Sequence, residues 1–177
     1  MLGCVVAGIL AVFLFLGLGP TAQHGGVLVS PGSTAPDFTL PSLTGGPPVT
    51  FSALGRDRHR PVVLNFFASW CTPCQAETPL LAATARAGQA KGSPVQFVGV
   101  DVAEPPAAAL AFARRSGITY PIGVDAHLDV SAARYGLNGQ PNTFFVDASG
   151  KVLGSHYGAV SEPLLEGWLH RLAGASG

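Results

Sequence analysis

Short apolar runs, separated by helix-forming and turn-forming stretches, recur along most of this 177-residue chain. The clearest run is PVVLNFF at residues 61–67, and VQFVGV at 95–100 has the same character. Nearly continuous runs of this length are typical of strands that are buried on both faces of a sheet. Further strands are predicted at 120–124, at 143–146 and, as an antiparallel neighbour of the latter, at 151–157.

Helix formers fill the intervals between these runs and predict helices at 75–90, 105–116, 128–135 and 161–172. Ahead of the first buried strand, apolar and polar residues alternate at 35–40 and again at 49–51, on either side of a Gly-Gly-Pro-Pro turn. This pattern predicts a β-hairpin at the sheet edge. The order of strands and helices indicates an α/β fold.

The N-terminus has a different pattern, because residues 2–19 are apolar throughout and long enough to cross a bilayer. We predict a transmembrane signal anchor at 1–20, with a cleaved signal peptide and a start that has lost its basic segment as the alternatives. Residues 21–33 are rich in Gly, Ser and Pro and predict a flexible tether, which leaves 34–174 as the folded domain. Each alternative places that domain outside the cytoplasm. We therefore expect a single-pass cell-membrane protein or, after cleavage, a secreted or periplasmic one.

Charge adds little to this picture. The formal net charge is zero and only 11% of residues are charged, so nothing suggests a nucleic acid partner. Cys4 is one of three cysteines and reads as a small apolar residue of the N-terminal span.

The other two cysteines, Cys71 and Cys74, are separated by two residues and directly follow the strand predicted at 61–67. Cys71 is thus expected at the start of a helix, where free N–H groups and the helix dipole favour a thiolate. A thiolate is the attacking species in disulfide exchange. Pro73 suits the first helical turn, because its missing N–H has no helical partner to lose there.

Three segments together resemble the membrane-anchored thioredoxin-like proteins of the TlpA/ResA type. They are APDF at 35–38, VLNFFASWCTPC at 63–74 with Glu77 and Pro79 after it, and QPNTFFVD at 140–147. The resemblance covers about 34–174 and implies a thioredoxin-like fold: a central mixed sheet flanked by helices, with an N-terminal β-hairpin and a central strand–helix insertion. It also implies an extracytoplasmic thiol–disulfide oxidoreductase that reduces specific clients such as apocytochrome c and is itself reduced by a membrane thiol donor.

The resemblance implies roles for individual residues of the motif. Cys71 would be the exposed, attacking thiol and Cys74 the resolving one. Pro141 would follow a cis peptide bond opposite the dithiol and expose the backbone of Gln140 to a client strand. Trp70, Thr72 and Pro73 would contact the client, and Trp70 can equally be read as a core aromatic.

Glu77 shares a helix face with Cys74, so a half-buried carboxylate there can accept the proton of Cys74 or raise the thiol pKa values. The alternative is a first-turn acid that complements the helix dipole. Thioredoxin has a buried aspartate at the position matched by Asn65, and an amide cannot titrate. This favours Glu77 as the proton acceptor. Glu104, in a loop after the second strand, reads as a solvated acid.

Three rival functions are weaker. A structural zinc site needs four ligands, and the five histidines have no paired spacing. A peroxiredoxin needs Thr or Ser three residues before its attacking cysteine, where Cys71 has Ala68. A copper(I) chaperone, the main alternative, usually adds a His or Met to the two thiolates, and Met1 is the single methionine. We expect no cofactor and no resident metal.

Overall fold

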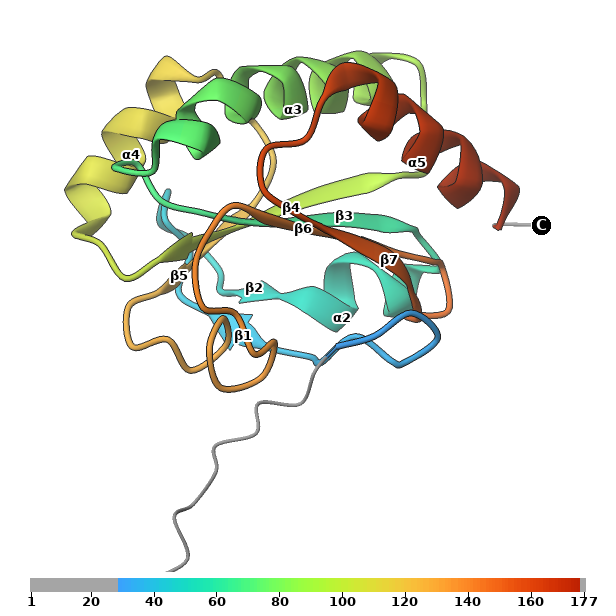
Figure 1. Cartoon of the computed structure of the whole chain (residues 1–177), viewed down its shortest axis with the longest axis horizontal. Coiled ribbons are helices and arrows are strands. Elements are labelled where there is room, and N and C mark those ends of the chain that lie inside the picture. The colour runs from blue at the N-terminus through green and yellow to red at the C-terminus, as the bar shows by residue number, and fades with distance from the viewer. Residues whose placement is uncertain (1–28, 176–177) are drawn as a thin grey trace, which may run out of the picture.

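The computed structural model describes residues 29–175, and its centre is a five-stranded sheet (Figure 1). The strand order is β5-β4-β3-β6-β7. Strands β3, β4 and β5 run parallel, whereas β6 is antiparallel to β3 and β7 antiparallel to β6, so the predicted mixed sheet is confirmed. The strand bounds are Val62–Phe67 (β3), Gln96–Val102 (β4), Ile122–Asp125 (β5), Asn142–Val146 (β6) and Val152–Tyr157 (β7).

The central strand β3 is buried on both faces, as its apolar run predicts. Val62, Leu64 and Phe66 pack on one side, and Val63 and Phe67 on the other. On the Val63 side the sheet is covered by three helices, α3 (Thr72–Ala90), α4 (Pro106–Arg115) and α5 (Glu162–Gly174), which lie above the sheet in Figure 1.

The opposite face is covered by the N-terminal hairpin β1 (Thr39–Leu40) and β2 (Val49–Thr50), followed by the short helices α2 (Phe51–Leu54) and η1 (Arg56–Arg58). The predicted hairpin is confirmed as an antiparallel pair. It lies against β5 at Gly123, where an added Cβ would come within 2.9 Å of Leu40. Glycine is therefore required for this close approach.

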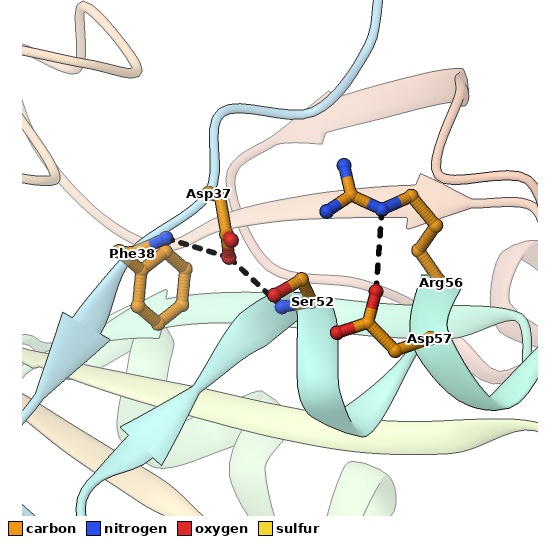
Figure 2. A network of polar contacts seen from close by, with 5 residues as sticks. All are labelled: Asp37, Phe38, Ser52, Arg56 and Asp57. Carbon is orange, nitrogen blue, oxygen red and sulfur yellow. Dashed lines mark hydrogen bonds and ion pairs between the residues drawn. The ribbon is translucent and has the colours of Figure 1, made fainter.

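Asp37 ties the hairpin to α2 (Figure 2). Its Oδ1 accepts hydrogen bonds from the backbone N–H of Phe38 at 2.9 Å and of Ser52 at 2.8 Å. In the adjoining η1 turn, Arg56 and Asp57 form an exposed ion pair at 3.5 Å. The acid of the APDF segment thus joins two pieces of chain 15 residues apart.

The helix predicted at 128–135 is wrong, since this segment forms a series of turns. The carboxylate of Asp125 accepts the backbone N–H groups of Val130, at 3.2 Å, and Ser131, at 2.7 Å. Leu128 adopts a left-handed φ of 62°. The left-handed Leu128 interrupts helical geometry, and the N–H groups of Ala133 and Tyr135 donate to the carbonyls of Leu128 and Val130, five residues back instead of the four of an α-helix.

The predicted tether at 21–33 is wrong for its last five residues. Val29 is buried in the core, the N–H of Gly32 donates to the carbonyl of Val152, and the N–H of Val152 donates to the carbonyl of Ser33. The predicted anchor at 1–20 lies outside the described residues. Within 29–175, no helix has both the length and the apolar character to cross a membrane.

Candidate active site

The two cysteines lie at the junction of β3 and α3, where the strand ends and the helix begins. Cys71 is the N-cap of α3, and its Sγ accepts the backbone N–H of Cys74 at 3.2 Å. Pro73 lies in the first turn, as predicted. The two sulfurs form a disulfide, with the Cα atoms 5.2 Å apart. Cys71 retains 5% of its surface and Cys74 none, so Cys71 is buried and not exposed as predicted, although it is the more accessible of the two cysteines.

The peptide bond between Gln140 and Pro141 is cis, which confirms that prediction. This bond leads into β6, the neighbour of β3, and so returns the chain to the dithiol from 69 residues away. The carbonyl oxygen of Gln140 lies 3.5 Å from Sγ of Cys71. Pro141 itself is buried, whereas Gln140 is half-buried at the surface.

Glu77 is fully buried one turn of α3 beyond Cys74, and the first turn of α3 contains no acid, so the interpretation of Glu77 as a first-turn acid that complements the helix dipole is wrong. Its Oε1 accepts the side-chain amide of Asn65 at 2.8 Å, and its Oε2 accepts the backbone N–H of Val160 at 2.7 Å. Burial raises the pKa of Glu77, and these two hydrogen bonds partly offset the increase. Asn65 also donates to Thr143 at 3.0 Å, which links β3 to β6 beneath the dithiol.

Trp70 is 62% exposed, which excludes the core-aromatic interpretation. Thr72 and Pro73 are also exposed. Trp70 lines a groove of about 430 Å³, whose other lining residues are mainly apolar. Its lining includes Phe66, Val102, Leu128, Leu137 and Gln140.

A second polar cluster, which the sequence analysis missed, lies behind Trp70. Glu104 is buried, and its carboxylate accepts both the backbone N–H of Ser69, at 2.6 Å, and the Ser69 hydroxyl. The solvated-acid interpretation of Glu104 is therefore wrong. Asp101, fully buried at the end of β4, lies beside it. A charged residue inside the apolar run that ends at Val102 was the signal available in the sequence.

The described residues, 29–175, contain no group of three or more His, Cys, Asp or Glu side chains able to hold a metal ion. The paired cysteines at the helix start support thiol–disulfide exchange, and the carbonyl oxygen of Gln140 lies beside Sγ of Cys71.

Comparison with known proteins gives the family. The AhpC/TSA family profile matches residues 31–154. The thiol–disulfide oxidoreductase ResA of Geobacillus thermodenitrificans is 40% identical over 124 residues, which cover 70% of this chain and 67% of that protein.

The chain belongs to the AhpC/TSA family and is a thiol–disulfide oxidoreductase. ResA of Bacillus subtilis is 32% identical over 142 residues, covering 80% of this chain and 75% of its own. A structure assigned as the thiol:disulfide interchange protein DsbE of Chlorobium tepidum superimposes with a TM-score of 0.70 at 30% identity. It covers 82% of this chain and 99% of its own. The predicted TlpA/ResA resemblance and the thioredoxin-like fold are thereby confirmed.

Proposed function

We propose that this oxidoreductase reduces disulfides of client proteins on the extracytoplasmic side of the membrane, with Cys71 attacking and Cys74 resolving. The observation that supports the roles of the two cysteines is the difference in access: Cys71 keeps a small accessible surface beside Gln140, and Cys74 has none. A thiol with no accessible surface cannot meet a disulfide in another protein, but it can attack a mixed disulfide formed at its neighbour.

The reaction is a two-electron exchange. The Cys71 thiolate attacks one sulfur of the client disulfide, so that a mixed disulfide forms and the client's other sulfur leaves as a thiolate. Cys74 then loses its proton and attacks Sγ of Cys71, which releases the second client thiolate. The client gains two electrons and, from solvent and Cys74, two protons, while the enzyme ends as the Cys71–Cys74 disulfide.

Glu77 would accept the proton of Cys74 in the second step. A carboxyl whose pKa is raised by burial is matched better to a thiol than an ordinary surface acid is. The carboxylate already accepts two hydrogen bonds, from Asn65 and Val160, which hold it in place.

Client binding would use the surface around Cys71. Gln140 would offer its backbone to an extended client strand, and Trp70, Thr72 and Pro73 would contact the residues around the client's cysteine. Pro141, which is buried, would contribute to client binding by holding Gln140 in place. Apocytochrome c is the proposed client. A membrane thiol donor would return the enzyme to its dithiol form, and residues 1–20 would anchor it to the membrane unless they are removed as a signal peptide.

A trapping experiment tests this assignment in cells. Cys74→Ser should accumulate a mixed disulfide between Cys71 and its client, because the second step is blocked. The matched control is Cys71→Ser/Cys74→Ser, which retains Cys4 and so reports any capture through that residue. Adducts present only in the single variant support the proposal, and identical adducts in both variants contradict it.

Further readouts test the attacking thiol, the direction of electron flow and the location. Purified Cys71→Ala should lose dithiothreitol-dependent insulin reduction altogether. In cells the wild-type pair should be found as a dithiol, alkylated by a membrane-impermeant maleimide added from outside. A pair found as a disulfide would identify an oxidant, and labelling only after cell lysis would refute the extracytoplasmic location.

A further inference from the structure

The loop that carries the nucleophile is held at Ser69, two residues before Cys71. From one side, the Glu104 carboxylate accepts the Ser69 N–H, at 2.6 Å, and its hydroxyl. From the other side, the Gln75 side chain donates to the Ser69 carbonyl at 2.7 Å. Both backbone polar groups of Ser69 are thus hydrogen-bonded to side chains, directly before Trp70 and two residues before Cys71.

The chain turns sharply to bring Glu104 to this loop. Ala103 has a φ of 50°, in the left-handed region that residues with a side chain rarely occupy. Its N–H donates to the carbonyl of Asp125 at 3.2 Å, which holds the turn against β5. Unfavourable backbone conformations of this kind persist where the surroundings over-determine them, often beside an active site.

Asp101 lies behind Glu104 with no exposed surface. Among residues 29–175, neither of its oxygens has a hydrogen-bond donor. The acids that face it are Glu104 and Asp125, and on the flanking strands its register partners are Phe67 and Val124. The carboxylate of Asp125 is already satisfied by Val130 and Ser131.

An ionised Asp101 would therefore be buried, unpartnered and next to two other acids, which is an unfavourable combination. A protonated Asp101 can instead donate a hydrogen bond to Glu104. The pKa of Asp101 is raised to about 8, mainly by burial. Glu104, as the acceptor of a hydrogen bond from protonated Asp101, and the charges of Glu104 and Asp125 raise it further.

We propose that Asp101 and Glu104 form a proton-sharing pair that positions the active-site loop: neutral Asp101 donates to Glu104, and the Glu104 carboxylate holds Ser69 so that Trp70 and Cys71 are placed for attack. Both acids are positioning residues, since they act through Ser69. The functional part of the proposal rests on Cys71 being the attacking thiol, as proposed above.

Loss of the shared proton places two negative charges side by side. The repulsion weakens the hold of Glu104 on Ser69, so Trp70 and Cys71 shift as the pH rises through the pKa of Asp101. The pair thus adds a pH dependence to the active-site loop that is separate from the ionisation of the cysteines.

The test uses the oxidised protein, in which the cysteines do not titrate. A Trp168→Phe background leaves Trp70 as the sole tryptophan of the two in the chain. The fluorescence of Trp70 is followed from about pH 5 to about pH 10, a range that lies above the ordinary pKa of an aspartic acid and includes the raised pKa of Asp101. We expect a change with a midpoint near pH 8, absent in Asp101→Asn and in Glu104→Gln.

Glu77→Gln is the matched control, because it removes the other buried acid with a raised pKa and should keep the transition. A transition that persists in Asp101→Asn, or that is missing in the parent protein, overturns the proposal. Ser69→Ala serves if Glu104→Gln does not fold, since it deletes one of the two bonds to Glu104 and should reduce the amplitude of the change.

A rate measurement adds the functional readout. At neutral pH, Asp101→Asn keeps a hydrogen-bond donor toward Glu104 and should alkylate at Cys71 as the parent does. Glu104→Gln should react about tenfold or more slowly, the scale of cost for a misplaced reacting group. Equal rates in both variants contradict the positioning role. Neither measurement involves a client, so failure here is distinguishable from failure of the trapping experiment.

Discussion

Replacing the buried acid Asp101 by asparagine should make the protein more stable at neutral pH. The pKa of Asp101 rises from its ordinary value of 3.8, which applies to the unfolded chain, to about 8 in the folded protein. Between these values the folded state binds a proton that the unfolded state has released. The stabilising contribution of the protonated Asp101 is therefore fully present below about pH 4 and is lost as the pH rises toward 8.

The size of the effect follows from the width of this window. Each pH unit within it costs about 1.4 kcal/mol of folding free energy. From pH 3.8 to neutrality the upper bound is roughly 4 kcal/mol, and structural relaxation around a buried acid reduces it, so we expect about 2–4 kcal/mol. Asparagine carries no proton to gain or lose, and its amide keeps the donor toward Glu104.

Urea unfolding of the oxidised protein, from about pH 4 to about pH 8, measures this difference. The free energies of unfolding of the two proteins should coincide near pH 4 and diverge steadily above it, with Asp101→Asn the more stable. Because Glu77 is present in both proteins, its titration affects both unfolding free energies equally and does not change their difference. Asp57→Asn removes the same charge from an exposed site and should show no such divergence. Parallel curves for wild type and Asp101→Asn, or a less stable variant at neutral pH, would refute the reasoning.

Two other predictions concern the site and the core. Glu77→Gln removes the carboxylate proposed to accept the Cys74 proton, so resolution of a mixed disulfide should slow by about 10²-fold. Stopped-flow measurement of a preformed mixed disulfide gives the rate of this resolution, and an unchanged rate would exclude Glu77 as the proton acceptor. Gly154→Ala should cost about 1–3 kcal/mol in urea unfolding, because its Cβ would overlap the Trp168 indole that stacks on Phe145. Gly167→Ala, a position with no described atom within 4 Å, should be neutral or slightly stabilising, and equal losses in both would contradict the steric argument.

Several features of the site could be predicted because they depend on neighbours in the chain. The apolar run of β3 and the helix formers after it placed Cys71 at a helix start, and Pro73 in the first turn agreed with that placement. The strands flanking β3 were found in the same way, since burial on both faces leaves a nearly continuous apolar run. The cis bond at Pro141 came from family resemblance, because no local pattern indicates it.

Other features could not be predicted, since they join residues far apart in the sequence. Glu104 reaches Ser69 across 35 residues and Glu77 reaches Val160 across 83, and both contacts exist because the sheet order brings their segments together. The prediction for 128–135 failed for a local reason: Leu128 has a left-handed φ of 62°, and the N–H groups of Ala133 and Tyr135 donate to carbonyls five residues back, so no α-helix forms.

The sequence by itself determined where the reactive sulfur would lie, because a strand, a helix start and two cysteines are adjacent in the chain. Only the tertiary structure decided which acids are buried, which backbone groups they hold and in which direction their pKa values shift. A pKa depends on burial and on charges within a few ångströms, and the folded sheet sets both.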